Sequence, residues 1–300
     1  MKILFTFPGQ GGQRPGMLAA LPDREAILTQ ARAVLGNEVA TLDSADALQH
    51  TRAVQLCLLI AGVAWARELQ RQGVDPQMVS GLSIGAFPAA VIAGALDFAS
   101  ALRLVALRGD LMEQAYPEGY GLTAIMGLTR PRVEALIQGH EVYLANLNAE
   151  TQFVIAGRDE AMAEVAQLAL RAGASKAQRL AVSVPSHCAL LDKPAAELAK
   201  AFAGASLRRP WCAYLSGSTA RVLWDPQRIA DDLAMNMARP VHWQEAMVAA
   251  DERDARLAIE MPPGGVLTCL TRQAGWRGET IALERSGLDV ARHLAQRLSD

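Results

Sequence analysis

Two kinds of hydrophobic pattern alternate along the chain. Short runs rich in branched and aromatic residues, such as 3–7 and 255–260, predict buried strands. Longer stretches rich in alanine and leucine predict helices, and the longest apolar one, 53–66, is interrupted by Gln55. It is too short to span a bilayer, so we expect a buried helix there. Further helices are expected at 23–35, 51–72, 86–94, 98–116, 194–203 and 266–271, and further strands at 79–80 and 211–216.

The pattern changes between residues 120 and 188. It predicts strand, helix, strand, strand, helix and strand in succession, which is the ferredoxin-like arrangement. We therefore expect a small ferredoxin-like domain at 120–188, inserted into a larger α/β domain made of 1–119 and 189–300. Its predicted elements lie at 122–128, 131–138, 142–145, 152–156, 159–172 and 178–184.

Composition narrows the classes of function. Hydrophobic residues make up 51% and charged residues 20% of the chain, which is typical of a globular protein with a large core. A net charge of −2 gives no electrostatic reason to bind nucleic acid or an anionic membrane. The first residues form too short an apolar run for a signal peptide, and we expect a cytoplasmic protein.

The four cysteines are widely spaced and form no C-x-x-C pair. We expect Cys57, Cys188, Cys212 and Cys269 to be buried thiols, not a zinc site or a disulfide framework. The sequence gives no other sign of a metal site or a cofactor.

The strongest candidate for chemistry is the Gly-x-Ser-x-Gly sequence at residues 81–85. It lies between a short predicted strand and a predicted helix, which is the context of a nucleophile elbow. A serine in such a turn is crowded on both sides, and Gly81 and Gly85 leave room for it. The Ser83 hydroxyl is then exposed, with the backbone N–H of Ile84 facing the group that it attacks. The pattern favours acyl transfer or acyl hydrolysis, although the same five residues also occur by chance in glycine-rich chains.

A serine nucleophile needs a base, and its oxyanion needs two hydrogen-bond donors. His187 follows a predicted strand end and a proline, so it is well placed to face a cleft; a hydrogen-bonded loop histidine is the alternative. His242 is a second, weaker candidate. The backbone N–H of Gln10, in the glycine-rich loop after the first strand, is a candidate second donor, unless this loop is a plain turn.

Arg108 lies on an apolar predicted helix, where burying a guanidinium without an anionic partner is costly. A surface position is the commoner outcome for such an arginine. If it faces the cleft, it would bind a substrate carboxylate through a bidentate pair.

Three further basic residues lie close together in the sequence, at Arg171, Lys176 and Arg179. They form either a solvated face or a contact for an acidic partner.

Six motifs, in this order, resemble those of malonyl-CoA:acyl-carrier-protein transacylases. They lie at 7–13, 81–85, 108–112, 182–187, 240–243 and 260–267. The resemblance reaches to about residue 270 and implies a hydrolase-like α/β large domain with a parallel sheet and a nucleophile elbow. The implied partners are malonyl-CoA and an acyl carrier protein with a phosphopantetheine-type arm, and no cofactor is implied.

The resemblance also implies roles for individual residues. Ser83 would carry the malonyl ester, His187 would be its general base, and Arg108 would pair with the free malonyl carboxylate. Gln10 and Ile84 would provide the oxyanion donors.

Two further roles come from the same resemblance. The main-chain carbonyl of His242 would orient the base histidine, so that His242 matters as backbone. Asn146 matches a family asparagine near the cleft and is expected to contact substrate.

The elbow departs from the common transacylase pattern Gly-His-Ser-x-Gly-Glu, because Leu82 replaces the histidine and Ala86 the glutamate. This version resembles the ε subunit of bacterial malonate decarboxylase, which loads malonyl onto that complex's own carrier protein. Other subunits of that complex would then be partners, and a transacylase of fatty-acid synthesis is the alternative. Two rivals differ in class: a serine thioesterase, which would want a side-chain acid to orient its histidine, and a docking subunit without turnover.

Overall fold

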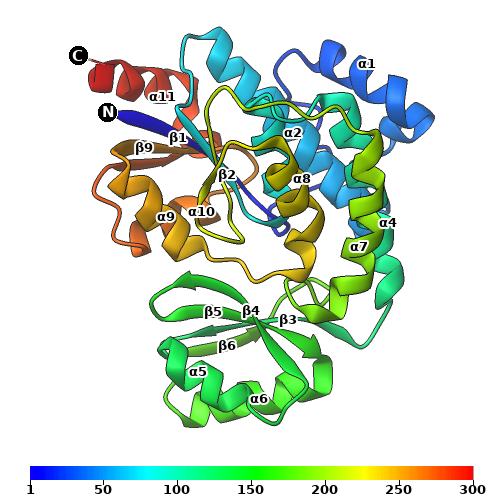
Figure 1. The fold of residues 1–300 in the computed structure, drawn as a ribbon, viewed down its shortest axis with the longest axis vertical. Helices are drawn as coiled ribbons and strands as arrows, with labels where there is room; N and C mark the ends of the chain where they lie inside the picture. The colour runs from blue at the N-terminus through cyan, green and yellow to red at the C-terminus, as the bar shows by residue number, and fades with distance from the viewer. Residues whose placement is uncertain (300) are drawn as a thin grey trace.

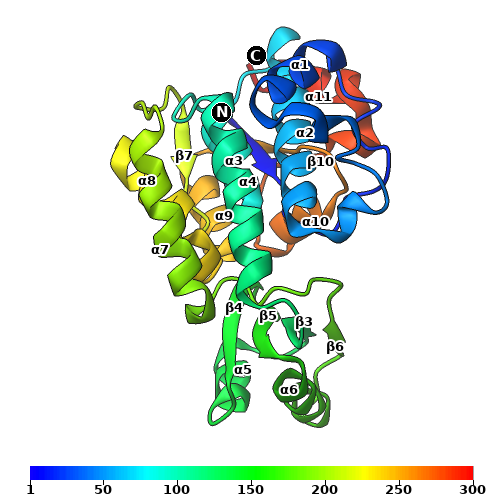
Figure 2. The same cartoon turned by 90° about the vertical axis from the view of Figure 1, so that its right-hand side faces the viewer.

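The computed structural model describes residues 1–299, which form two lobes built on separate sheets (Figures 1 and 2). The larger lobe holds a six-stranded sheet of order β10-β9-β1-β2-β7-β8. It is parallel except for β8, which pairs antiparallel with β7. Its strands are β1 (Lys2–Phe7), β2 (Met78–Gly81), β7 (Ala213–Leu215), β8 (Val222–Leu223), β9 (Ala255–Glu260) and β10 (Glu279–Ala282).

Helices cover both faces of this sheet. Alternate residues of β1 show this, since Phe5 and Phe7 join one buried cluster and Leu4 the other. A strand covered on both sides has an unbroken apolar sequence, which explains the pattern at 3–7. The first cluster packs against α1 (Arg24–Leu35), α2 (Thr51–Arg71), α3 (Ala86–Ile92), α4 (Phe98–Ala115), α7 (Asp192–Ala201), α8 (Pro226–Met235) and α11 (Leu283–Ser299), and the second against α9 (Trp243–Glu252) and α10 (Val266–Gln273).

The smaller lobe is an antiparallel sheet of order β4-β5-β3-β6, and the predicted β-α-β-β-α-β succession is confirmed. Two helices cover the face that points away from the large lobe (Figures 1 and 2). We propose that this lobe corresponds to a domain at 120–188, with 1–119 and 189–300 forming the other. Its elements are β3 (Tyr120–Met126), α5 (Arg130–Ile137), β4 (Val142–Ala149), β5 (Gln152–Arg158), α6 (Asp159–Arg171) and β6 (Lys176–Arg179).

The last of these strands differs from its prediction. A strand was expected at 178–184, but β6 ends at Arg179. The N–H of Leu180 still donates to Leu122 O of β3 at 2.9 Å, and the chain then leaves the sheet. Residues 180–186 cross to the large lobe as an irregular segment, called the crossover segment below. The Arg179 side chain binds the carbonyls of Leu180 and Val182, which a continuing strand would have paired with its neighbour.

Three other outcomes concern the large lobe. The buried helix expected at 53–66 is the middle of α2. Cys57, Cys188 and Cys212 are buried as expected, but Cys269 is exposed because it lies on the outer side of the amphipathic helix α10. Within residues 1–299, no helix is both long enough and apolar enough to cross a membrane.

The two lobes are joined by backbone pairing as well as by the chain itself. The N–H of Leu147, on β4, donates to Val241 O at 2.8 Å, and the N–H of Val241 donates to Ala145 O at 2.8 Å. This bridge places Asn146, between them, at the boundary of the lobes.

Candidate active site

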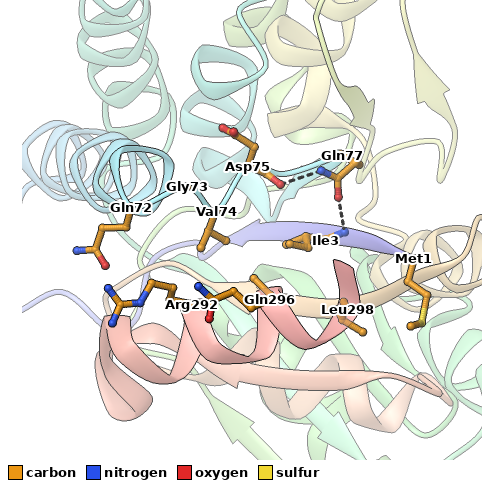
Figure 3. Close-up of a pocket in the computed structure, with 11 residues that line it drawn as sticks. Met1, Ile3, Gln72, Gly73, Val74, Asp75, Gln77, Arg292, Gln296 and Leu298 are labelled. Atoms are coloured by element: carbon orange, nitrogen blue, oxygen red, sulfur yellow. Dashed lines mark hydrogen bonds between the residues drawn. The ribbon is translucent and has the colours of Figure 1, made fainter. Parts of the chain in front are cut away.

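Two cavities lie at opposite ends of the large sheet. One, of about 490 Å³, opens beside the start of β1 and is lined by Ile3, Asp75 and Gln77 and by Arg292 and Gln296 of α11 (Figure 3). Ligands of parallel α/β sheets bind beyond the carboxyl ends of the strands. This cavity lies at the amino ends, so it is not the candidate active site.

The second cavity, of about 260 Å³, lies beyond the carboxyl ends, between the lobes. It brings together several residues that the sequence predicted for the site. Its lining comprises Gln10, Leu82, Ser83, Leu122, Ala124, Asn146, Asn148, Gln152, Val154, Leu180, Val182, Ser186, His187, Val266 and Leu270.

Ser83 occupies a strained turn directly after β2. Its φ is +57°, in the left-handed region that side chains other than glycine rarely adopt. A Cβ at position 81 would lie 2.0 Å from the carbonyl carbon of Gly85, and a Cβ at position 85 would lie 2.1 Å from Phe7 O. Both glycines are therefore required by close backbone contacts, as the nucleophile-elbow prediction demanded.

The loop that carries Gln10 is packed between the elbow and a second loop. A Cβ at Gly9 would lie 2.8 Å from Leu82 Cδ2, and a Cβ at Gly12 would lie 3.1 Å from Pro263 O. These contacts place Gln10 in the wall of the cavity near Ser83. The donor roles of the Gln10 and Ile84 N–H groups stay predictions.

His187 is held by main-chain oxygens. It is 3% exposed, its φ is +67°, and its N–H donates to Met237 O at 2.6 Å. Its Nδ1 lies 2.8 Å from Asn236 O and 3.2 Å from Arg239 O. Because carbonyls only accept hydrogen bonds, Nδ1 carries the proton and Nε2 keeps its lone pair.

The electrostatic surroundings keep this imidazole neutral. Burial, followed by the positive charge of Arg108, lowers the pKa of His187 to about 4. At neutral pH His187 is therefore able to accept a proton.

The expectation for His242 is wrong. The carbonyls that orient His187 belong to Asn236 and Arg239, because the short 3₁₀ helix η6 (Asn236–Ala238) turns them toward the imidazole. The His242 carbonyl instead accepts from Ala246 N at 2.9 Å, inside the first turn of α9.

Arg108 is fully buried, and its guanidinium reaches Ser83, which lines the cavity, so the surface alternative is wrong. Nη1 donates to Gln55 Oε1 at 2.7 Å, and Nη2 donates to Asn236 Oδ1 at 2.9 Å and to Ser83 Oγ at 3.2 Å. All three acceptors are uncharged, and within residues 1–299 no carboxylate forms an ion pair with this guanidinium. Burial lowers the pKa of Arg108 to about 9, so it remains a cation at neutral pH.

Two residues of the site were missed from the sequence. Asn236 contacts three parts of it, since Nδ2 also donates to Ser83 O at 3.2 Å. Gln55 holds the other end of the Arg108 guanidinium. Gln55 could have been found from the sequence, because it is a polar residue within an apolar run. Nothing in the local sequence distinguishes Asn236.

Asn146 lies where the sequence placed it, in the wall contributed by the small lobe. It is 5% exposed, and its Nδ2 donates to Asn148 Oδ1 at 3.4 Å. Its Oδ1 is buried and has no hydrogen-bond partner in the described part of the chain. A substrate contact stays a prediction for this residue.

Known proteins identify the family. The family described as acyl transferase domain matches residues 4–286. A malonyl CoA-acyl carrier protein transacylase of Escherichia coli K12 is 37% identical over 285 residues, covering 91% of this chain and 92% of the relative. The chain belongs to the malonyl-CoA:acyl carrier protein transacylase family of acyltransferases. The transacylase of that name from Bacillus subtilis is 32% identical, covering 94% of this chain and 93% of the relative.

Solved structures of related transacylases have the same fold. An acyl-carrier-protein S-malonyltransferase from Burkholderia pseudomallei matches with a TM-score of 0.91 and 34% identity, covering 98% of this chain and 100% of that one. A malonyl-transacylase in complex with a type II polyketide acyl-carrier protein matches with a TM-score of 0.91 and 34% identity, covering 98% and 99%. This protein is therefore an acyltransferase with the mixed α/β fold of its relatives.

Proposed function

We propose that this acyltransferase moves a malonyl group from malonyl-CoA to an acyl carrier protein through a malonyl ester on Ser83. The names of its relatives support the substrates. The observation that carries the proposal is Arg108, a fully buried cation that contacts the Ser83 hydroxyl and has only uncharged partners. A malonyl group supplies the missing anion at this position, and an acetyl group does not.

The first half-reaction begins with a change of partner at Arg108. A carboxylate is a stronger acceptor than a hydroxyl, so the bound malonyl group takes the Arg108 guanidinium from Ser83 Oγ. The hydroxyl then turns to His187 Nε2, which takes its proton as Oγ attacks the thioester carbon. The resulting oxyanion accepts from the N–H groups of Gln10 and Ile84, each worth about 3 kcal/mol of activation free energy.

Collapse of this intermediate breaks the carbon–sulfur bond. The departing CoA sulfur takes the proton from His187, and the malonyl group remains on Ser83 as an ester. In the second half-reaction the thiol of the carrier's arm gives its proton to His187 and attacks the ester, and the proton returns to Ser83.

The orientation of His187 favours transfer over a thioesterase reaction. A thioesterase of this type would want a carboxylate beside Nδ1, whereas His187 has the carbonyls of Asn236 and Arg239 there. Neutral carbonyls fix the tautomer and stabilise the imidazolium less than a carboxylate would.

The intermediate provides the direct test. After mixing with malonyl-CoA and quenching in acid, intact mass spectrometry should show one malonyl adduct, and peptide mapping should place it on Ser83. Ser83→Ala should give no adduct, and acetyl-CoA should label the wild-type protein far less. An adduct on another residue, or transfer to a carrier by Ser83→Ala, would refute the mechanism.

For the acceptor, we propose the carrier protein of a malonate decarboxylase complex, with the other subunits of that complex as partners. Support comes from the elbow, where Leu82 and Ala86 replace the histidine and glutamate of the common pattern. Both side chains are apolar: Leu82 lines the cavity, and Ala86 is buried. The carrier of fatty-acid synthesis is the alternative acceptor.

A further inference from the structure

Arg179, the last residue of β6, ties together three segments of the chain around the cavity. Its Nε donates to Asp159 Oδ1 at 2.7 Å, at the start of α6, and its Nη2 donates to Tyr120 O at 2.8 Å, at the start of β3. Its Nη1 donates to Val182 O at 2.7 Å and also to Leu180 O, both in the crossover segment. All three nitrogens are thus engaged within the protein.

The guanidinium rests on Gly121. A Cβ at this position would lie 2.0 Å from Arg179 Nη2, 2.3 Å from Cζ and 2.5 Å from Nη1. The three nearest atoms all belong to this one side chain, so any other residue at 121 would push the guanidinium away. Gly121 and Arg179 therefore form a matched pair.

This pair determines part of the cavity wall. Leu122, Leu180 and Val182 line the cavity, and each has its carbonyl bound by Arg179, that of Leu122 at 3.3 Å. The crossover segment has no strand or helix to satisfy its carbonyls, so Arg179 takes the place of a sheet neighbour.

The same segment leads directly to His187, but the histidine does not depend on it for position. The backbone and imidazole of His187 are bound to Met237, Asn236 and Arg239 of the large lobe. A change at Arg179 would loosen the apolar wall and leave the reacting groups in place.

We propose that Arg179 is a positioning residue for thioester binding: through the carbonyls of the crossover segment it fixes the apolar wall along which the long arm of each thioester reaches Ser83. This inference rests on the proposed malonyl transfer. The Arg179 side chain is 38% exposed, but its hydrogen bonds to Asp159, Tyr120 and the crossover segment assign it a role in ordering the protein, in place of the carrier contact that the sequence left open.

The test separates binding from chemistry. In Arg179→Ala, the KM values for malonyl-CoA and for the carrier protein should both rise about tenfold, because the wall must be ordered when each thioester binds. The kcat value should stay within about twofold of that of the wild-type protein. Phenylmethylsulfonyl fluoride is a small reagent that does not contact the apolar wall, so its rate of Ser83 inactivation should also change less than about twofold. Arg179→Lys should not restore KM, because an ammonium cannot reach the same set of carbonyls.

A double-mutant cycle guards against loss of folding. Gly121→Ala alone should reproduce the rise in KM, whereas Gly121→Ala added to Arg179→Ala should have no further effect, because the methyl group then meets no guanidinium. Arg130→Ala, which removes an exposed guanidinium and its ion pair with Glu134 from α5 in the same lobe, is the matched control and should leave both KM values unchanged.

Three results would overturn the role of Arg179. The first is that Arg179→Ala lowers the melting temperature but leaves both KM values unchanged. The second is that Arg179→Lys fully restores both KM values. The third is that only the KM for the carrier protein changes and that this change disappears at high salt, which would indicate electrostatic docking. A wild-type protein that transfers no malonyl group would instead refute the proposed function, so the two failures are distinguishable.

Discussion

Arg108 is the residue whose environment says most about the substrate. A buried guanidinium normally has a carboxylate beside it, because the cost of desolvation is otherwise too large. Here the acceptors are the amide oxygens of Gln55 and Asn236 and the hydroxyl of Ser83. The Arg108 side chain is therefore held in place by the protein, and under the proposed function the malonyl carboxylate neutralises its charge.

Removal of this charge should alter the choice of acyl group. Arg108→Ala should lower kcat/KM for malonyl-CoA by about a hundredfold, the cost of losing a buried charge pair. The value for acetyl-CoA should change much less, so the malonyl-to-acetyl preference narrows. Arg103→Ala, on the exposed side of the same helix, is the control. An unchanged preference in competition assays would rule out this role for Arg108.

His187 should set an unusual pH dependence. Because its pKa is lowered to about 4, the imidazole stays neutral far below its ordinary value of 6.5. The rate of Ser83 acylation should therefore persist as the pH falls below 6, and its acid limb should lie nearer 4. The unfolded chain takes up the proton first, so the stability that His187 contributes is present above pH 6.5 and is lost as the pH falls toward 4. An acid limb centred near 6.5 in single-turnover measurements would contradict the burial argument.

At the scale of elements, the elbow depends on backbone contacts between consecutive segments. The chain passes from β2 through Ser83 into α3 so tightly that the turn touches the end of β1. These contacts involve main-chain atoms, which cannot move aside as a flexible side chain does.

Gly85→Ala should therefore lower the free energy of unfolding by about 3 kcal/mol, at the upper end of the cost of overpacking. Its Cβ would meet Phe7 O at 2.1 Å and Pro8 O at 2.9 Å. Urea denaturation followed by circular dichroism measures this change. Gly204→Ala, where a Cβ meets no atom within 4 Å, should be near neutral. Equal stabilities of the two variants would mean that the turn relaxes freely.

Elements with a clear period were predictable from the sequence. The strand expected at 255–260 is β9, and the successive elements of the small lobe follow the expected order. The end of β6 was not predictable, because the Arg179 side chain, and not a neighbouring strand, binds the carbonyls of Leu180 and Val182. The helices α8, α9 and α11 were missed although the sequence carries their signals: α8 and α11 place their apolar residues at the helical period, and α8 begins with an Asp225 cap followed by Pro226.

At the scale of the whole molecule, the site is a product of tertiary structure. The motifs identified Ser83, Arg108 and His187, and the fold places all three at one cavity or in contact with it. Spacing within a motif could not tell which carbonyl faces the imidazole, since that depends on how η6 turns. The assignment to His242 failed for this reason, and Asn236 was missed with it.

The choice of carrier also belongs to this scale. If the acceptor is the malonate decarboxylase carrier protein, kcat/KM for transfer to it should exceed that for the fatty-acid carrier by about tenfold or more, since recognition involves a whole surface. Both carriers should be compared in their thiol forms at the same salt concentration. The reverse order of preference would place the protein in fatty-acid synthesis and leave the Ser83 mechanism intact.

The two backbone hydrogen bonds that join β4 to Val241 have a consequence for turnover. Swinging the lobes apart about a hinge would break both of them. Under the proposed mechanism, one thioester would therefore be exchanged for the next through a mouth of fixed width. The ester on Ser83 would stay sheltered from hydrolysis between the departure of the first thiol and the arrival of the second.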